Sequence, residues 1–514
     1  MTRKFISFIV LFLPLILTAQ SKNKVTEKYA KTITADDMRK HLYIIASKEM
    51  EGRDTPSPGL EKAANYIEEH FKSLGLSPGN GESFRQYYPL YRDSVVAAFL
   101  KVNGKSFELS KDFQPQSSNF TGEMRFSEIV FAGYGISDGD NRDDYKDLQV
   151  AGKLVMILDG SPADYKPSQQ GFRSPASSFG KINAAMNKGV ASLIFINNNF
   201  PRSSFNRTSG WSMNSYRVTQ FPFTFSISPA VASEILGEND KSILEKAKSN
   251  ELTTKIFKAA IDLGFSKETK TTHVSNVIGL LEGTDRKDEY VVISAHYDHI
   301  GKRNDTTINY GADDDGSGTT GVLELAEAFA EAKKAGKGPR RSILFLAVSG
   351  EEKGLLGSRY YTENPVFPLE KTTVDLNIDM IGRIGNDYKK DKDSVNYVYV
   401  IGDDKLSSDL TPITDQVNNT YTKMKLDRKY NDPNDPNRFY FRSDHYNFAE
   451  KGVPIIFYFN GVHADYHRPT DTPDKINYPL MAKRTQLVFY TAMEMANREE
   501  MLKRDKPLEA PRGF

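Results

Sequence analysis

The sequence contains no cysteine among its 514 residues. This absence excludes disulfide bonds, thiolate metal sites, iron–sulfur clusters and a cysteine nucleophile. Any metal ion must therefore be held by His, Asp and Glu side chains. An excess of charge is also absent, because 68 basic residues stand against 67 acidic ones, a formal net charge of +1. We expect no nucleic-acid partner, since proteins of that class carry a strongly basic surface.

Long apolar runs are scarce as well. One apolar run, from Phe5 to Leu17, follows Arg3 and Lys4. Its length of about 13 residues fits the core of a signal peptide and falls short of the ~20 residues that span a bilayer. We expect a signal peptide at residues 1–20, export to the periplasm or the medium, and no stable membrane insertion after cleavage. An uncleaved membrane anchor is the alternative.

Patterning divides the rest of the chain into segments. Residues 21–33 are polar and are expected to form a linker. Residues 34–95 carry apolar residues at helical spacing and are expected to be the first part of the large domain. Residues 96–262 alternate short strand-like runs with turn residues and contain no cluster of His, Asp and Glu. This pattern favours an inserted, β-rich binding or shielding module that takes no part in catalysis.

Residues 263–505 alternate strand-like and helical patterns. The strand-like runs are apolar on both faces and are predicted at residues 290–295, 342–347, 374–378, 396–401 and 453–458. Strands buried on both faces and separated by helices are typical of a largely parallel sheet. The sequence therefore predicts an α/β domain with a mostly parallel, mixed sheet flanked by helices.

Acidic and imidazole side chains follow these predicted strands. In open α/β sheets, ligands bind beyond the carboxyl ends of the strands. The segments that follow the strands, together with one loop between the first two, contain His296, Asp298, His299, Asp313, Asp314, Asp315, Glu351, Glu352, Asp379, His463 and His467. We expect these side chains to meet at one edge of one sheet.

A divalent cation is the simplest explanation for this convergence. Clustered carboxylates without a counter-ion repel one another and would be driven to take up protons. His and carboxylate donors without thiolates suit zinc at a hydrolytic site. Two His and three carboxylates are too many for one tetrahedral zinc, but two zinc ions sharing a carboxylate would leave positions open for water. Of the adjacent Glu351 and Glu352, one can bind metal while the other acts as a general base.

At this point the sequence resembles a known family, the two-zinc exopeptidases of metallopeptidase family twenty-eight. The matching strings are SAHYDHIG, GADDDGSG, SGEEKGLLGS, NIDMIGR and YHRPTDT, in the order of the family, and they cover residues 275–475. The opening string ASKEMEGRDTPSPGLEKAANYIEEHF extends the resemblance to about residue 40. The strings IVFAGYGI, VAGKLVMILDG and KGVASLIFINN resemble the protease-associated domain that many members carry as an insert.

The resemblance implies roles for single residues. One zinc ion would be bound by His296, Asp314 and Asp379, and the other by Asp314, Glu352 and His467. Glu351 matches the general base, Asp298 the acid that orients His296, and Tyr466 a residue that steadies the oxyanion in some members. The residues themselves do not separate Asp314 from Asp313 and Asp315. The remaining histidines near these segments, which match no ligand position, are expected to be supporting or structural: His299, His445 and His463.

The function implied is that of an exported two-zinc aminopeptidase, which hydrolyses the first peptide bond of a peptide substrate with metal-activated water and Glu351 as base. A carboxypeptidase or dipeptidase is the main alternative, and it calls for an arginine fork drawn from Arg383, Arg438 and Arg442. A single-zinc acyltransferase similar to glutaminyl cyclases and a non-catalytic binding protein are further alternatives. The neutral charge and the lack of a basic phosphate loop disfavour a phosphatase or nuclease.

Overall fold

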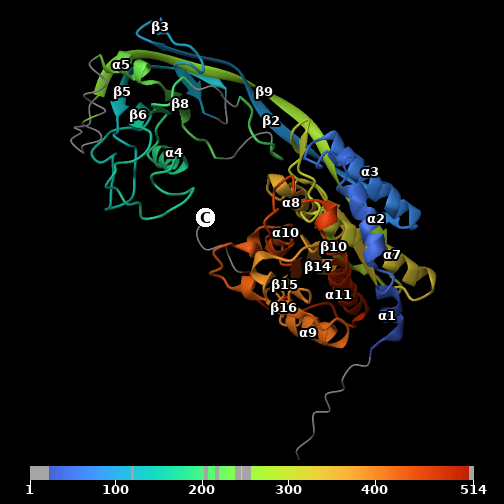
Figure 1. Cartoon of the computed structure of the whole chain (residues 1–514). Coiled ribbons are helices and arrows are strands. Elements are labelled where there is room, and N and C mark those ends of the chain that lie inside the picture. The colour runs from blue at the N-terminus through green and yellow to red at the C-terminus, as the bar shows by residue number, and fades with distance from the viewer. Residues whose placement is uncertain are drawn as a thin grey trace, which may run out of the picture. The chain divides into compact units, whose positions relative to one another are not determined.

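The computed structural model describes residues 22–116, 121–201, 207–214, 219–237, 245 and 256–508 (Figure 1). The predicted signal peptide at residues 1–20 lies outside these residues. The chain divides into two compact units, unit 1 with Met1–Tyr88 and His273–Phe514, and unit 2 with Pro89–Thr272. The chain enters unit 2 within strand β2 (Arg85–Val102) and leaves it within strand β9 (Ile256–Leu281).

The sheet of unit 1 has the strand order β16–β15–β17–β14–β10–β13–β9. Its strands are β10 (Arg286–His296), β13 (Arg341–Val348), β14 (Thr372–Ile378), β15 (Tyr397–Ile401), β16 (Lys425–Asp427), β17 (Ile455–Phe459) and the last part of β9. Strands β13, β10, β14 and β17 are parallel neighbours, whereas β9 and β15 pair antiparallel to this core. The predicted mixed sheet with a parallel core is therefore confirmed.

Helices cover both faces of this sheet. The ring of Phe345 in β13 lies 6.2 Å from the ring of Phe329 in α7. The preceding residue, Leu344, packs instead in a cluster with Tyr361 of α8 and Phe448 of α10. Because successive strand residues point to opposite faces, α7 lies on one face and α8 and α10 lie on the other. The central strands β13 and β14 are thus buried along their whole length, between helices on both sides.

The helices of unit 1 follow the predicted alternation with the strands. They are α1 (Lys24–Ala30), α2 (Ala35–Ile45), α3 (Pro58–Ser73), α7 (Gly316–Lys334), α8 (Leu356–Glu363), α9 (Leu410–Thr420), α10 (His445–Glu450) and α11 (Tyr478–Asn497). Short 3₁₀ helices lie at 48–50, 351–353, 369–371, 386–388, 429–431, 439–441 and 473–475. Among the described residues, no helix is both long enough and apolar enough to cross a membrane.

The expectation of a linker at residues 21–33 is wrong. Helix α1 occupies most of this segment, and the side chain of Asn23 caps it by accepting from the backbone N–H groups of Val25 and Thr26. Tyr29 and Ala30 are buried, and α1 packs on α7 and α11. A short polar segment therefore becomes a helix because two of its side chains find a core, which composition alone does not reveal.

Unit 2 contains a second mixed sheet, in the order β9–β5–β6–β7–β8–β4. Strands β5 to β8 are parallel neighbours, β9 pairs antiparallel with β5, and β4 pairs antiparallel with β8. Strand β2 also pairs with β9. The strands are β4 (Phe113–Pro115), β5 (Gly122–Phe131), β6 (Leu154–Leu158), β7 (Ser192–Ile196) and β8 (Phe223–Ile227), and the helices are α4 (Ser178–Asn187) and α5 (Pro229–Leu236). Four very short strands complete the described part of the chain: β1 (Ser77–Pro78), β3 (Lys105–Ser106), β11 (Lys302–Asn304) and β12 (Thr307–Ile308).

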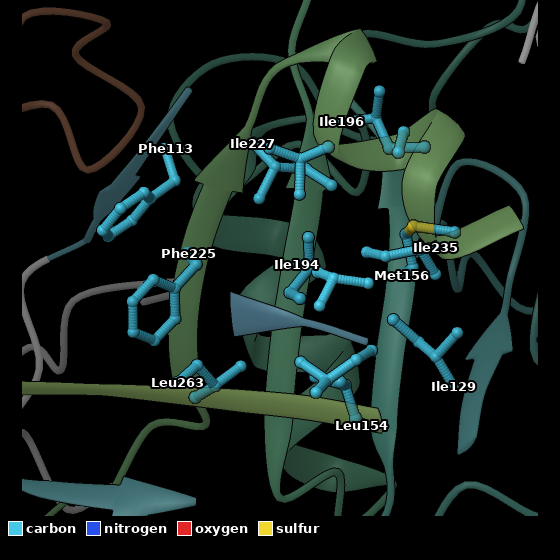
Figure 2. Close-up of a cluster of buried hydrophobic side chains, with 14 of the residues drawn as sticks. Phe113, Ile129, Leu154, Met156, Ile194, Ile196, Phe225, Ile227, Ile235 and Leu263 are labelled. Carbon is cyan, nitrogen blue, oxygen red and sulfur yellow. The ribbon is translucent and has the colours of Figure 1, made fainter. Parts of the chain in front are cut away.

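The core of unit 2 lies on both faces of its sheet. On one face, Met156 and Ile194 pack with Ile235 of α5, as Figure 2 shows. On the other face, Val155 packs with Ala185 of α4. The predicted insert at residues 96–262 lies inside this unit, and its assignment as a protease-associated domain stays a prediction.

Candidate metal centre

The ends of three parallel strands bring the predicted side chains together in unit 1. Strand β10 ends at His296, a 3₁₀ helix (Glu351–Lys353) follows β13, and Asp379 follows β14. The His296 Nε2 atom lies 3.7 Å from Asp379 Oδ1, 3.9 Å from Glu351 Oε2 and 3.5 Å from Asp314 Oδ1. Residues 83 positions apart in the sequence are thus neighbours at one edge of the sheet.

A second group of donors lies on the other side of Asp314. The His467 Nε2 atom is 3.0 Å from Asp314 Oδ2 and 3.3 Å from Glu352 Oε2. Asp314 therefore faces His296 with one oxygen and His467 with the other. This is the arrangement that a carboxylate shared between two cations requires.

His299 is a member of this second group. Its Nδ1 atom lies 2.9 Å from Glu352 Oε1 and 3.7 Å from Asp314 Oδ2, and its side chain is fully buried. Gly311 makes room for the ring, because a Cβ atom there would lie 2.5 Å from His299 Cγ. No ligand role is predicted for His299 from the sequence, and its place directly after Asp298 is the signal that could have found it.

The three consecutive aspartates have different surroundings. The Asp313 carboxylate accepts from the backbone N–H of Gly382 and pairs with His463 at 3.0 Å. The Asp315 carboxylate accepts from the N–H of Gly318 in the first turn of α7, as an N-cap. Only the Asp314 carboxylate points into the group of histidines and glutamates. The structure thus separates three residues that the sequence left equivalent.

The backbone around Asp314 is held by two residues that the sequence reasoning gave no role. The Asp471 carboxylate accepts from the backbone N–H groups of Asp313 and Asp314, at 2.9 and 3.2 Å. Arg53 is fully buried and donates to the carbonyl oxygens of Tyr297 and Gly311. Its guanidinium group therefore ties the loop after β10 to the loop before α7.

Asp298 contacts two of the candidate residues. Its Oδ1 atom accepts from the backbone N–H of Glu351 at 3.1 Å and lies 3.7 Å from His296 Nδ1. Its backbone carbonyl oxygen lies 3.2 Å from the same Nδ1 atom. A hydrogen bond at Nδ1 holds the ring so that Nε2 faces the carboxylate oxygens of the candidate metal site.

The electrostatics of the cluster call for a positive charge. Burial raises the pKa of Glu351 well above its usual value, and burial together with Glu352 raises that of Asp314. Burial alone would lower the pKa of His296, but the carboxylates of Glu351 and Asp379 raise it well above the usual value. A cluster that can become neutral only by taking up protons is one that divalent cations would stabilise.

The donor set fits metal ions on geometric grounds as well. Three buried atoms, His296 Nε2, Asp314 Oδ2 and Glu352 Oε1, have no hydrogen-bond partner within the described part of the chain. Two ligands bound at about 2.0–2.1 Å to a tetrahedral ion lie about 3.3 Å apart. The distances of 3.0–3.9 Å between neighbouring donors are close to that value. The residues therefore form a candidate two-metal centre.

An open pocket adjoins these residues. Asp314, Glu351 and Asp379 form its polar end. The rest of its lining is mostly apolar and consists of Met380, Phe439, Phe457, Phe459, Val462, Tyr466 and Arg442. Tyr466 stacks on His467, and its hydroxyl group lies 3.5 Å from Arg442 Nη2.

The two other histidines that the sequence singled out have structural contacts. His445 is buried, stacks on Phe457 and lies 2.8 Å from the carbonyl oxygen of Tyr440. His463 is buried against Asp313. The neighbouring Ser443 accepts from the side chain of Asn377, so this segment braces the wall of the pocket at β14.

The fold and the donor set define a class, that of α/β proteins with a candidate two-metal site at the ends of parallel strands. Comparison with known proteins identifies the family. Residues 276–492 match the profile of Peptidase family M28. This segment carries all of the candidate site residues and matches that family, so the resemblance found in the sequence is confirmed.

Individual relatives agree with this assignment. A protein of Arthroderma otae named "Probable leucine aminopeptidase" is 31% identical over 216 residues, which are 41% of this chain and 55% of that protein. The chain thus spans about half the length of that relative. Leucine aminopeptidase 2 of Trichophyton rubrum is 24% identical over 85% of this chain and 83% of its own length. The solved aminopeptidase from Aneurinibacillus sp. strain AM-1 has a TM-score of 0.53 at 19% identity, covering 94% of this chain and 98% of its own, so it shares the fold.

Proposed function

We propose that this chain is a two-zinc metallo-aminopeptidase that removes N-terminal residues from peptides. One zinc ion would be held by His296, Asp314 and Asp379, and the other by Asp314, Glu352 and His467. The observation that carries the proposal is the position of Asp314, whose two carboxylate oxygens face histidines of the two different groups. The similarity to peptidase family M28 and to proteins named leucine aminopeptidases supports it.

Glu351 is the proposed general base. When bound, the zinc pair would polarise the scissile carbonyl group and lower the pKa of water to near neutrality. Glu351 lines the pocket, and its backbone is held by Asp298, so its carboxylate can take the proton from the attacking water. It then passes this proton to the leaving amine. Tyr466 lines the same pocket and is the proposed donor to the oxyanion.

The pocket supports a preference for apolar N-terminal residues. Met380, Phe439 and Phe457 are among its lining residues, and they offer an apolar surface to a leucine or phenylalanine side chain. We therefore expect leucine and phenylalanine to be removed faster than aspartate or glutamate.

Arg442 keeps a second candidate function open, that of a carboxypeptidase or dipeptidase. A substrate carboxylate is best bound by a pair of guanidinium groups. Arg442 lines the pocket, but Arg383 is paired with Asp465 at 2.7 Å. Arg438 lies over the ring of Phe441 and is not among the lining residues. One arginine at the pocket favours the aminopeptidase over its rival.

A panel of substrates tests both candidates. Free-amine aminoacyl anilides should be hydrolysed by the zinc-restored protein and not by the metal-stripped protein. An N-acetylated dipeptide should be stable, whereas a dipeptide amide with a free N-terminus should be cleaved. Cleavage of the N-acetylated dipeptide with a free C-terminus would instead support the carboxypeptidase.

The number of zinc ions can be tested with two variants. Asp314→Asn removes the shared ligand and should lower bound zinc by two ions per chain, whereas Glu352→Gln should lower it by one. The measurement is elemental analysis of folded, desalted protein. A loss of only one ion from Asp314→Asn would contradict the shared site.

We also propose that the protein is exported by the signal peptide at residues 1–20. The apolar run from Phe5 to Leu17 after Arg3 and Lys4 supports this. N-terminal sequencing of the mature protein should find a start near residue 20 or 21. An intact N-terminus on the secreted or membrane-bound protein would contradict cleavage.

A further inference from the structure

A second cluster of histidines and glutamates lies between three helices of unit 1, away from the strand ends. His41 belongs to α2, His70 to α3, and Glu324 and Glu327 to α7. One donor atom each from His41, His70 and Glu327 lies within 4.8 Å of the other two. None of these residues takes part in the proposed peptidase mechanism.

Both histidines can turn a ring nitrogen with a free lone pair toward the cluster. The Nδ1 atom of His41 lies 2.7 Å from the hydroxyl of Tyr66, and the Nε2 atom of His70 lies 3.4 Å from the carbonyl oxygen of Leu323. Donation of these N–H groups leaves His41 Nε2 and His70 Nδ1 as the unprotonated nitrogens.

Glu324 adds a buried donor without a partner. The residue is 2% exposed, and its Oε1 atom has no hydrogen-bond partner within the described part of the chain. This oxygen lies 3.7 Å from His41 Nε2. Burial raises the pKa of Glu324 to about 8. A buried carboxylate oxygen left unpaired is costly unless a proton or a cation occupies the site.

We propose that His41, His70 and Glu327 bind a divalent transition-metal cation, with Zn²⁺ as the best match. Two imidazoles and a carboxylate without thiolate are ligand types that zinc takes, and they leave one tetrahedral position for water. The buried Glu324 carboxylate beside His41 would add a second negative charge to balance the ion.

The site is separate from the candidate catalytic centre. Glu324 lies ten residues after Asp314, mostly along α7, which corresponds to about 15 Å at the helical rise per residue. An ion at this position would link α2 and α3 to the helix that starts beside the catalytic aspartates. Its expected effect is therefore on stability, with little effect on turnover.

The test compares two neighbouring glutamates of α7. Glu327→Gln removes a ligand, whereas Glu331→Gln removes the same charge one turn further on, at an exposed position outside the cluster. Zinc content is measured on the folded full chain after desalting. Glu327→Gln should lose one zinc ion per chain relative to the wild type, and Glu331→Gln none. Adding Zn²⁺ after chelation should raise the melting temperature more for Glu331→Gln than for Glu327→Gln, while turnover stays within about twofold.

Three outcomes would overturn the proposal: equal zinc content in Glu327→Gln and the wild type, equal losses in both glutamate variants, or a zinc-dependent melting shift that Glu327→Gln retains in full. If Glu327→Gln does not fold, His70→Asn, at a partly exposed position of α3, is measured in its place against the same control. The readout is a difference from the wild type, so it does not depend on how many ions the catalytic site holds. The zinc measurement is repeated with Glu327→Gln and Glu352→Gln combined. Because the two sites are separate, the double variant should lose the sum of the zinc ions that the single variants lose.

Discussion

The two units have similar sheets and very different strand ends. Each sheet has a core of parallel strands with helices on both faces. In unit 2, Asp159 and Asn197 follow strands β6 and β7, and the Asn197 side chain donates to Asp159 at 3.0 Å. The buried Lys181 donates to the carbonyl oxygens of Leu158 and Gly160. The polar groups at these ends therefore satisfy one another.

In unit 1 the segments near the carboxyl ends of the parallel strands carry buried polar atoms, and these atoms have no hydrogen-bond partner within the described residues. They include His296 Nε2, Asp314 Oδ2 and Glu352 Oε1. Leaving such atoms unpaired costs free energy unless a ligand completes them. A ligand-binding site can form at the carboxyl ends of parallel strands in either sheet. Whether it does depends on the side chains that follow the strands.

Replacing Glu351 is the strongest test of whether the strand ends of unit 1 form a catalytic site. Glu351→Gln keeps the shape of the side chain and removes the base, so turnover should fall by about 10²–10⁴-fold. Bound zinc should stay at the wild-type level, because Glu351 is not a proposed ligand. Steady-state kinetics and elemental analysis provide the two measurements. Turnover within tenfold of the wild type would exclude Glu351 as the base.

Tyr466 tests whether the pocket wall contributes to the chemistry. Tyr466→Phe removes the proposed donor to the oxyanion, and the loss of one such donor costs about 10²–10³-fold in kcat. The KM value should change little, because the ring and its stacking on His467 remain. The control is Tyr446→Phe in α10, whose hydroxyl is not part of the pocket lining. A change confined to KM would assign Tyr466 to substrate binding instead.

The strands of the parallel core could be predicted from the sequence because each is a short run that is apolar on both faces. The long strands β2 and β9 were missed, since their exposed residues break any simple alternation and their pairing partners lie far away in the sequence. Helix α1 could not be predicted from its polar composition, because only tertiary contacts bury Tyr29.

The candidate site was more predictable in its residue types than in its details. The strings around His296, Glu351 and His467 indicated which segments meet. The choice of Asp314 among three aspartates rested on resemblance, because Asp313 is occupied by Gly382 and His463 and Asp315 by Met380, all far along the chain. The role of Arg53 could not be predicted either, because its side chain binds backbone carbonyl groups, and no pattern of residue types indicates such a contact.

His299 sharpens the comparison at a residue that the sequence left without a role as a ligand. Its buried Nδ1 atom lies 2.9 Å from Glu352 Oε1, so the ring packs against the carboxylate that faces His467 and limits its position. His299→Gln should weaken zinc binding about 10–100-fold, as is typical for residues that orient metal ligands. The measurement is a competition titration with a zinc-binding dye. His445→Gln, which also replaces a buried imidazole, should leave zinc affinity unchanged, and equal losses in both variants would point to general destabilisation.

Lys181 provides the converse test at the strand ends of unit 2. Lys181→Met keeps the length of the side chain and removes its hydrogen bonds to two carbonyl groups, which should cost about 1–3 kcal/mol of stability in unit 2. Peptidase turnover should stay unchanged.

The pH dependence of the same variant has a definite sign. Burial lowers the pKa of Lys181 from 10.5 to about 8, so between these pH values the unfolded chain holds a proton that the folded chain has released. Stability of the wild type must therefore rise with pH through this window relative to Lys181→Met, which has no such group. Chemical denaturation at pH 8 and pH 10 measures the difference. A gap in unfolding free energy that stays constant would mean that Lys181 remains charged in the folded unit and would contradict the lowered pKa.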